Sequence, residues 1–205
     1  HFYTVISFKF EKKMLFKNTK TAFSLKKNIE LKRAYLLFKI ISYPFLVNLG
    51  KFLVMISVKL RLPVEHLIRL SVFDQFCGGI DEKDSLKIVN LLATKNVKSY
   101  IHYSVEGASL EKDYDNCLAS TIKTLEVSKK NSSLLFSVFK PTGYGSSVLF
   151  EKKSNKIPFT KDESNAWDRI IERFRITFDK AKSIGLSVFV DAEESWIQPA
   201  IDEIV

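Results

Sequence analysis

The sequence predicts an α/β protein in which N-terminal helices are followed by the first three strand–helix units of an incomplete (β/α)8 barrel. In the second half of the chain, short apolar segments alternate with amphipathic ones. Each apolar segment ends at a charged residue, and the first half shows helical spacing without strand candidates. Strand, helix, strand, helix, strand in that order predicts right-handed parallel crossovers.

Charge divides the 205-residue chain in the same place as the predicted elements. Residues 1–70 contain 14 Lys or Arg against 3 Asp or Glu, whereas residues 71–205 contain 18 against 20. We therefore expect a basic helical segment over residues 1–96 and the first part of a barrel over residues 97–205. Residues 1–13 precede Met14 and carry no signal-peptide pattern, so we interpret them as lying upstream of the native start.

The most apolar stretch of the basic segment is Tyr35 to Leu60. A membrane-spanning helix needs about 20 uninterrupted apolar residues. Lys39, Pro44 and Lys51 interrupt this stretch, so two shorter amphipathic helices are expected. The excess of lysine can serve an anionic membrane surface or nucleic acid, or simply form a solvated helical face. No nucleic-acid-binding motif accompanies it, which makes nucleic acid an unlikely partner.

Two cysteines and three histidines limit the chemistry further. Cys77 and Cys117 lie too far apart to suggest a metal-ligand spacing, and no disulfide framework is expected. A zinc site of cysteine and histidine is improbable for the same reason. Neither cysteine has a candidate base near it in the sequence, so both are interpreted as structural.

The expected elements follow from helical periodicity, caps and breakers. Asp81 is expected to cap a helix that runs to about Lys95, and Gly185 suits the position after the last helix. Pro141 lacks an N–H for a strand ladder, so the second strand must finish at Lys140. The sequence predicts strands that end at Glu106, Lys140 and Asp191, and helices over 113–129 and 164–185. No GxGxxG follows the first strand, which counts against a dinucleotide-binding domain.

Lys140 and Asp191 are the candidate site residues, because active sites of parallel α/β folds lie at the carboxyl ends of the strands. Lys140 can form a Schiff base, attract a substrate carboxylate, or be an ordinary exposed lysine. Asp191 can pair with Lys140 at the barrel mouth, or cap a helix that begins near Glu193. Glu194 fits the start of that helix, and Glu193 is left open.

His102 lies in the middle of the first predicted strand, and a buried, hydrogen-bonded role is favoured over a catalytic one. Glu106, at the end of that strand, has the same ambiguity as Asp191. A metal site made from Asp191 and the glutamates is disfavoured, because neighbouring strand residues point to opposite faces.

The strand ends "HYSVEG", "FSVFKPTGYG" and "VFVDAEESWIQ", together with "LRLPVEHLIRLSVFDQFCGGI", resemble proline dehydrogenase, the flavin enzyme of proline catabolism. The resemblance covers about Met14 to Val205 and implies that the chain is an N-terminal fragment. Two features depart from it: His102 replaces an expected aspartate, and "GYGSS" replaces an expected alanine-leucine-glycine-arginine run.

What the resemblance implies is an FAD-dependent oxidation of L-proline to Δ1-pyrroline-5-carboxylate, with electrons passing to a membrane quinone. Lys140 would bind the substrate carboxylate, Asp191 would be the catalytic carboxylate, and Ala192 would lie against the FAD. The implied location is the cytoplasm or the periphery of the inner membrane, mitochondrial in a eukaryote, with the basic segment contacting the membrane. The alternatives left open are a basic helical interaction module and a Schiff-base barrel lyase that uses Lys140.

Overall fold

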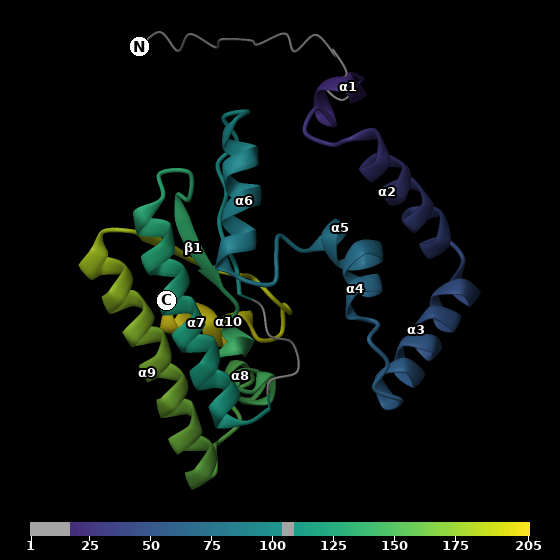
Figure 1. Cartoon of the computed structure of the whole chain (residues 1–205). Helices are drawn as coiled ribbons and strands as arrows, with labels where there is room; N and C mark the ends of the chain where they lie inside the picture. The colour runs from purple at the N-terminus through teal and green to yellow at the C-terminus, as the bar shows by residue number, and fades with distance from the viewer. Residues whose placement is uncertain (1–16, 104–108) are drawn as a thin grey trace, which may run out of the picture. The chain divides into compact units, whose positions relative to one another are not determined.

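The computed structural model describes residues 17–103 and 109–205, and the chain divides between Gly79 and Ile80 into two compact units. Figure 1 shows the helices and strands of both units. The helices of the first unit are α1 (Thr19–Ala22), α2 (Asn28–Ile41), α3 (Pro44–Lys59), α4 (Glu65–Ile68), the π-helix η1 (Arg69–Phe73) and α5 (Asp74–Phe76). The elements of the second unit are α6 (Glu82–Ala93), α7 (Glu111–Lys130), β1 (Phe136–Phe139), the 3-10 helix η2 (Pro141–Gly143), α8 (Ser147–Ser154), α9 (Lys161–Ile184), β2 (Ser187–Val190) and α10 (Gln198–Ile204).

In the first unit, the break between α2 and α3 lies at Pro44, which occupies the first turn of α3. Proline suits that position because the amide there has no partner within the helix. None of the described helices is by itself long and apolar enough to cross a bilayer. Only α2 and α3 taken together have the length and the apolar composition of a span, and the pair is bent by 102°. None of the described residues of this unit, 17–79, is buried.

The second unit contains the buried core, and its helices α6 and α9 begin at capping side chains. The Asp81 side chain accepts a hydrogen bond from the Asp84 N–H at the start of α6, which confirms the predicted cap. Thr160 and Glu163 form a capping box at the start of α9. Gly185 follows α9 in the left-handed region, with φ of 60°, and β2 begins two residues later.

The sheet consists of β1 and β2, which pair in parallel with Phe136 opposite Ser187 and Phe139 opposite Val190. Just before β1, Leu134 forms an isolated parallel bridge with Ser99. Phe139, Val188 and Val190 pack into the helical core, and Phe189 between the last two is 54% exposed. One face of the sheet therefore packs on helices, while the other leaves Phe189 half exposed.

Aromatic rings fill the core. The Phe139 ring stacks on Tyr144 at 4.6 Å between centroids and meets Phe174 edge-on at 5.2 Å. The hydroxyl of Tyr144 is hydrogen-bonded to the hydroxyl of Thr177 on α9 at 2.6 Å. Burial raises the pKa of Tyr144 to about 12, so it stays neutral. The buried core residues are Cys117, Phe139, Tyr144, Leu149, Phe150, Trp167, Ile170, Phe174, Ile197, Ala200 and Ile201.

Arg173 joins α7 to α9 through charge. Its guanidinium is 5% exposed and donates hydrogen bonds to Glu111, to Asp115 and to the Tyr144 carbonyl. A buried charge is tolerated only when it is paired and hydrogen-bonded. Arg169, one helical turn earlier on α9, also donates to Glu111.

The predicted fold class is wrong. The described residues are mostly helical and contain one two-stranded parallel sheet, without the three strand–helix units of a partial barrel. The stretch expected as the first strand contributes only the bridge at Ser99, since its described residues do not continue a ladder along β1. Its predicted end, Glu106, lies outside the described residues.

Candidate functional site at the strand ends

Lys140 and Asp191 follow the last paired residues of the two strands. Phe139 and Val190 are register partners, and the Asp191 N–H continues the ladder with a 2.9 Å hydrogen bond to the Phe139 carbonyl. Lys140 keeps an extended backbone, with φ of −93° and ψ of 130°. The next step of the same register therefore places Lys140 opposite Asp191.

The two-residue period of a strand assigns both residues to a face. Phe139 and Val190 pack into the helical core, so the residues that follow them alternate to the opposite face, which also carries Phe189. Both Lys140 and Asp191 are half-buried. A cation and an acid thus lie next to each other on the more open face of the sheet.

The expected ion pair between them is absent. Within residues 17–103 and 109–205, no ion pair of 4.0 Å or less involves either Lys140 or Asp191. Among the described residues, therefore, neither the Lys140 ammonium nor the Asp191 carboxylate is engaged in an ion pair.

Glu193 has a clear role that the sequence did not show. One of its carboxylate oxygens accepts a hydrogen bond from the Thr142 N–H at 2.9 Å, and the other accepts one from the Thr142 hydroxyl at 2.7 Å. The first amides of a helix have no partner within it, so the N–H of Thr142 in η2 is free to be bound in this way. We call this pair the Glu193–Thr142 clamp; it joins the loop after β2 to the turn after β1.

The clamp corrects the interpretation of the acidic segment. A helix was expected to begin near Glu193, but α10 begins at Gln198 and residues 191–194 belong to no helix. Glu194 is exposed, and its backbone carbonyl accepts a turn hydrogen bond from Ile197. The alternative of Asp191 as a helix cap is therefore wrong as well.

His102 lies within electrostatic range of the strand-end charges. Burial lowers its pKa first of all; Asp191 raises it, Lys140 lowers it and Glu193 raises it by smaller amounts. The lowered pKa favours the neutral imidazole at neutral pH. Its buried Nε2 has no hydrogen-bond partner among the described residues, so the hydrogen-bonded role expected for it is not seen there.

Other predicted features add little to the site. Ala192 is exposed directly after Asp191, and the structure does not test its predicted contact with FAD. Cys77 is exposed and Cys117 is buried on α7, and both are free thiols. In the part of the chain that the structure describes, no three His, Cys, Asp or Glu side chains form a group that could hold a metal ion.

A comparison with known proteins finds a named relative that matches much of this chain. The chain is 34% identical over 130 residues to the carbapenem antibiotics biosynthesis protein CarD of Pectobacterium carotovorum subsp. carotovorum. The match takes in 63% of this chain and 35% of CarD, so the chain spans about a third of the length of that relative. No family model matches the sequence.

This finding overturns the family prediction. The named relative belongs to carbapenem biosynthesis, so the assignment to proline dehydrogenase is wrong, and with it the predicted flavin-dependent oxidation of L-proline in proline catabolism. The two alternative functions, a basic interaction module and a Schiff-base lyase, are not supported either. Nothing tests FAD, L-proline, a quinone, the membrane or the location of the protein, and these stay predictions.

Proposed function

We propose that this chain belongs to a biosynthetic protein of the kind represented by CarD, and that its strand ends bind a small carboxylated amine. CarD is named for the biosynthesis of carbapenem antibiotics. That role comes to this chain as a proposal, because the match spans only about a third of CarD.

The observation that carries the proposal is that Lys140 and Asp191 form no ion pair with any residue that the structure describes. The two side chains follow register partners on adjacent strands, yet no ion pair joins them. A half-buried ammonium attracts a carboxylate, and a half-buried carboxylate attracts an amine. A small molecule that carries both groups satisfies both side chains at once.

The residues around this pair fit the same role. The Glu193–Thr142 clamp fixes the two loops that follow the strands, and a site on fixed elements holds its ligand more accurately. A neutral His102 adds a hydrogen-bonding group without a further charge. The chain's own residues thus supply binding and orientation, and any chemical step is left to the whole protein.

Binding of L-proline by residues 1–205 tests the proposal, with pyrrolidine as the same ring without a carboxylate. We expect L-proline to bind more tightly than pyrrolidine in calorimetric titration. Lys140→Met, which keeps the length of the side chain and removes its charge, should weaken L-proline at least about tenfold and leave pyrrolidine unchanged, because charged hydrogen bonds contribute about 1.5–3 kcal/mol.

Lys112 on α7 is exposed and provides the matched control, so Lys112→Met should change neither affinity. Asp191→Asn should weaken both ligands, since both carry the amine. Wild-type protein that binds neither compound, or Lys140→Met protein that binds L-proline as tightly as wild type, would overturn the proposal.

A further inference from the structure

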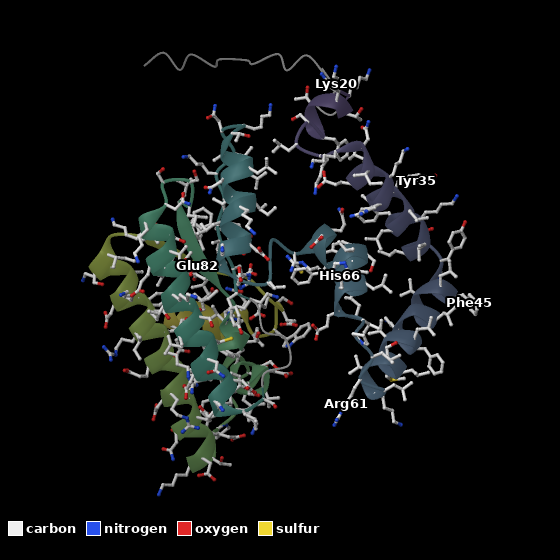
Figure 2. The ribbon with its side chains drawn as sticks, viewed as in Figure 1. Lys20, Tyr35, Phe45, Arg61, His66 and Glu82 are labelled. Atoms are coloured by element: carbon white, nitrogen blue, oxygen red, sulfur yellow. The ribbon has the colours of Figure 1, made fainter. Side chains whose placement is uncertain are left out.

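The first unit, residues 17–79, presents apolar side chains to solvent on every long helix. Phe45 on α3 is 76% exposed, Tyr35 on α2 is 70% exposed and Met55 on α3 is 63% exposed. Figure 2 labels Tyr35 and Phe45 on these two helices. Soluble proteins rarely expose contiguous apolar patches of this kind unless a partner covers them. The exposed large apolar residues of α2 and α3 are Ile29, Tyr35, Leu36, Phe38, Ile40, Ile41, Phe45, Leu46, Leu49, Phe52, Leu53, Val54, Met55 and Val58.

The same helices carry an excess of positive charge. Residues 17–79 contain 11 Lys or Arg against 3 Asp or Glu, a net charge of +8. Glu30 is the one acid in the sequence of α2 and α3, and its side chain accepts a hydrogen bond from the Lys27 N–H at the start of α2. The exposed cations of the two helices are Lys32, Arg33, Lys39, Lys51 and Lys59.

We propose that α2 and α3 bind the surface of a membrane that contains anionic lipids. An apolar surface bordered by lysine and arginine is typical of helices that lie in the membrane interface. Their aromatic and aliphatic side chains enter the boundary between headgroups and acyl chains, while the lysine stems extend so that each ammonium reaches the phosphates. An anionic membrane surface thus complements both the positive charge and the exposed apolar side chains of α2 and α3.

Other occupants satisfy only half of this surface. Nucleic acid would neutralise the charge, but its backbone offers no cover for Phe45, Leu53 or Met55. A second copy of the chain would cover the apolar side chains, but it would bring two units of net charge +8 together. Like charges placed close together across an interface oppose association.

Sedimentation of the full chain with lipid vesicles tests the proposal. The vesicles consist of phosphatidylcholine alone, or of phosphatidylcholine with about one third phosphatidylglycerol, which supplies the anionic surface. We expect the chain to bind the anionic vesicles at least about tenfold more tightly than the neutral ones, because each lysine or arginine near such a surface adds to the attraction. Raising the salt concentration should weaken the binding, since salt screens these charges.

Two exposed phenylalanines test the apolar contribution. The double variant Phe45→Ser and Phe52→Ser should bind anionic vesicles at least about tenfold more weakly, because each ring loses its burial in the bilayer. Val148 and Ile157 of the second unit are also exposed, at 55% and 48%. The matched control, Val148→Ser with Ile157→Ser, should bind as wild type does.

Two lysines of α3 test the charge. Lys51→Gln with Lys59→Gln should weaken binding to anionic vesicles about tenfold or more and leave any binding to neutral vesicles unchanged. Lys112 and Lys182 are exposed in the second unit, and the same double change there should have little effect. Lys140→Met should leave vesicle binding intact, which separates this proposal from that of the carboxylate site.

Three results would overturn the membrane proposal. Equal binding to the two kinds of vesicle, or no binding to either, would show that anionic lipid is not the partner. Vesicle binding that survives the change of Phe45 and Phe52 would exclude insertion of this face. A dimer in sedimentation velocity that dissociates on the same change would assign the surface to a second copy of the chain.

Discussion

Gly145 can be replaced by no larger residue without a collision, because Ile170 of α9 occupies the place of its side chain. A Cβ at Gly145 would lie 2.2 Å from Ile170 Cδ1 and 2.3 Å from Ile170 Cγ1. Ile170 is 1% exposed, so it has no free space to move into. Overpacking of a core lowers the free energy of unfolding by about 1–3 kcal/mol. An alanine in place of a glycine raises it by about 0.4–1 kcal/mol, because it restricts the unfolded chain. For so short a contact, we expect Gly145→Ala to lower the free energy of unfolding by about 2 kcal/mol net.

A second substitution identifies the colliding atoms. Ile170→Ala removes both of them and should cost about 2–5 kcal/mol alone through the cavity it leaves. In the double variant the new methyl group meets no obstacle, so the loss should fall short of the sum of the single losses by at least about 2 kcal/mol. Gly143→Ala is the graded control, because its Cβ would lie 3.3 Å from Cys117 Sγ, and we expect a smaller loss there.

Urea unfolding followed by tryptophan fluorescence measures these differences. Trp167 is 8% exposed in the core and contacts the Phe150 ring edge-on at 5.3 Å between centroids. Trp196 is 58% exposed, so the measurements belong in a Trp196→Phe background that leaves only the buried reporter. Losses from Gly145→Ala and Ile170→Ala that add to within about 0.5 kcal/mol would refute the collision, because independent sites behave in that way.

Two further predictions concern the acids Glu111 and Glu193 of the second unit. Hydrogen bonds from arginine, that of Arg169 foremost, lower the pKa of Glu111 to about 2, against an ordinary value of 4.5. The ionised Glu111 therefore contributes fully to the free energy of unfolding above about pH 4.5, and this contribution is lost as the pH falls towards 2. Because the Glu111 side chain is 46% exposed, we expect the free energy of unfolding to fall by only about 1 kcal/mol. Urea unfolding of the wild type and of Glu111→Gln across this pH range should show this fall in the wild type alone. An equal change of the free energy of unfolding with pH in both proteins would contradict the prediction. Glu193→Ala should speed hydrogen exchange of the Thr142 amide and lower the free energy of unfolding by about 1–2 kcal/mol, whereas Glu194→Ala should do neither. A Thr142 amide that stays protected from exchange in Glu193→Ala would exclude the clamp.

The parts of the fold that depend on local sequence could be predicted. Asp81, Gly185 and Pro141 fix their backbone by capping, by a left-handed conformation and by a missing N–H, and each acts at its own position. Helices over most of α7 and α9 follow from apolar residues at three- and four-residue steps. These signals need no knowledge of the rest of the chain.

The parts that depend on distant contacts could not. The Glu193–Thr142 clamp joins residues 51 positions apart, and the local sequence around either residue does not predict the contact. The Lys140–Asp191 ion pair was expected but is absent, because the register of two strands does not determine where the ends of long side chains lie. Strands that end in charged residues are typical of many parallel sheets, so this pattern did not specify a barrel or an activity.

The register between β1 and β2 makes the site depend on events at the opposite end of the sheet. Asp191 faces Lys140 only because the chain leaves α9 at Gly185 and enters β2 with Ser187 opposite Phe136. A strand that slips by one residue turns every side chain to the other face. Deleting one residue from the turn after α9 would set a methyl group, that of Ala192, across from Lys140 and send the carboxylate towards the core. The length of the turn that precedes β2 thus decides whether Lys140, beyond the far end of that strand, lies opposite an acid.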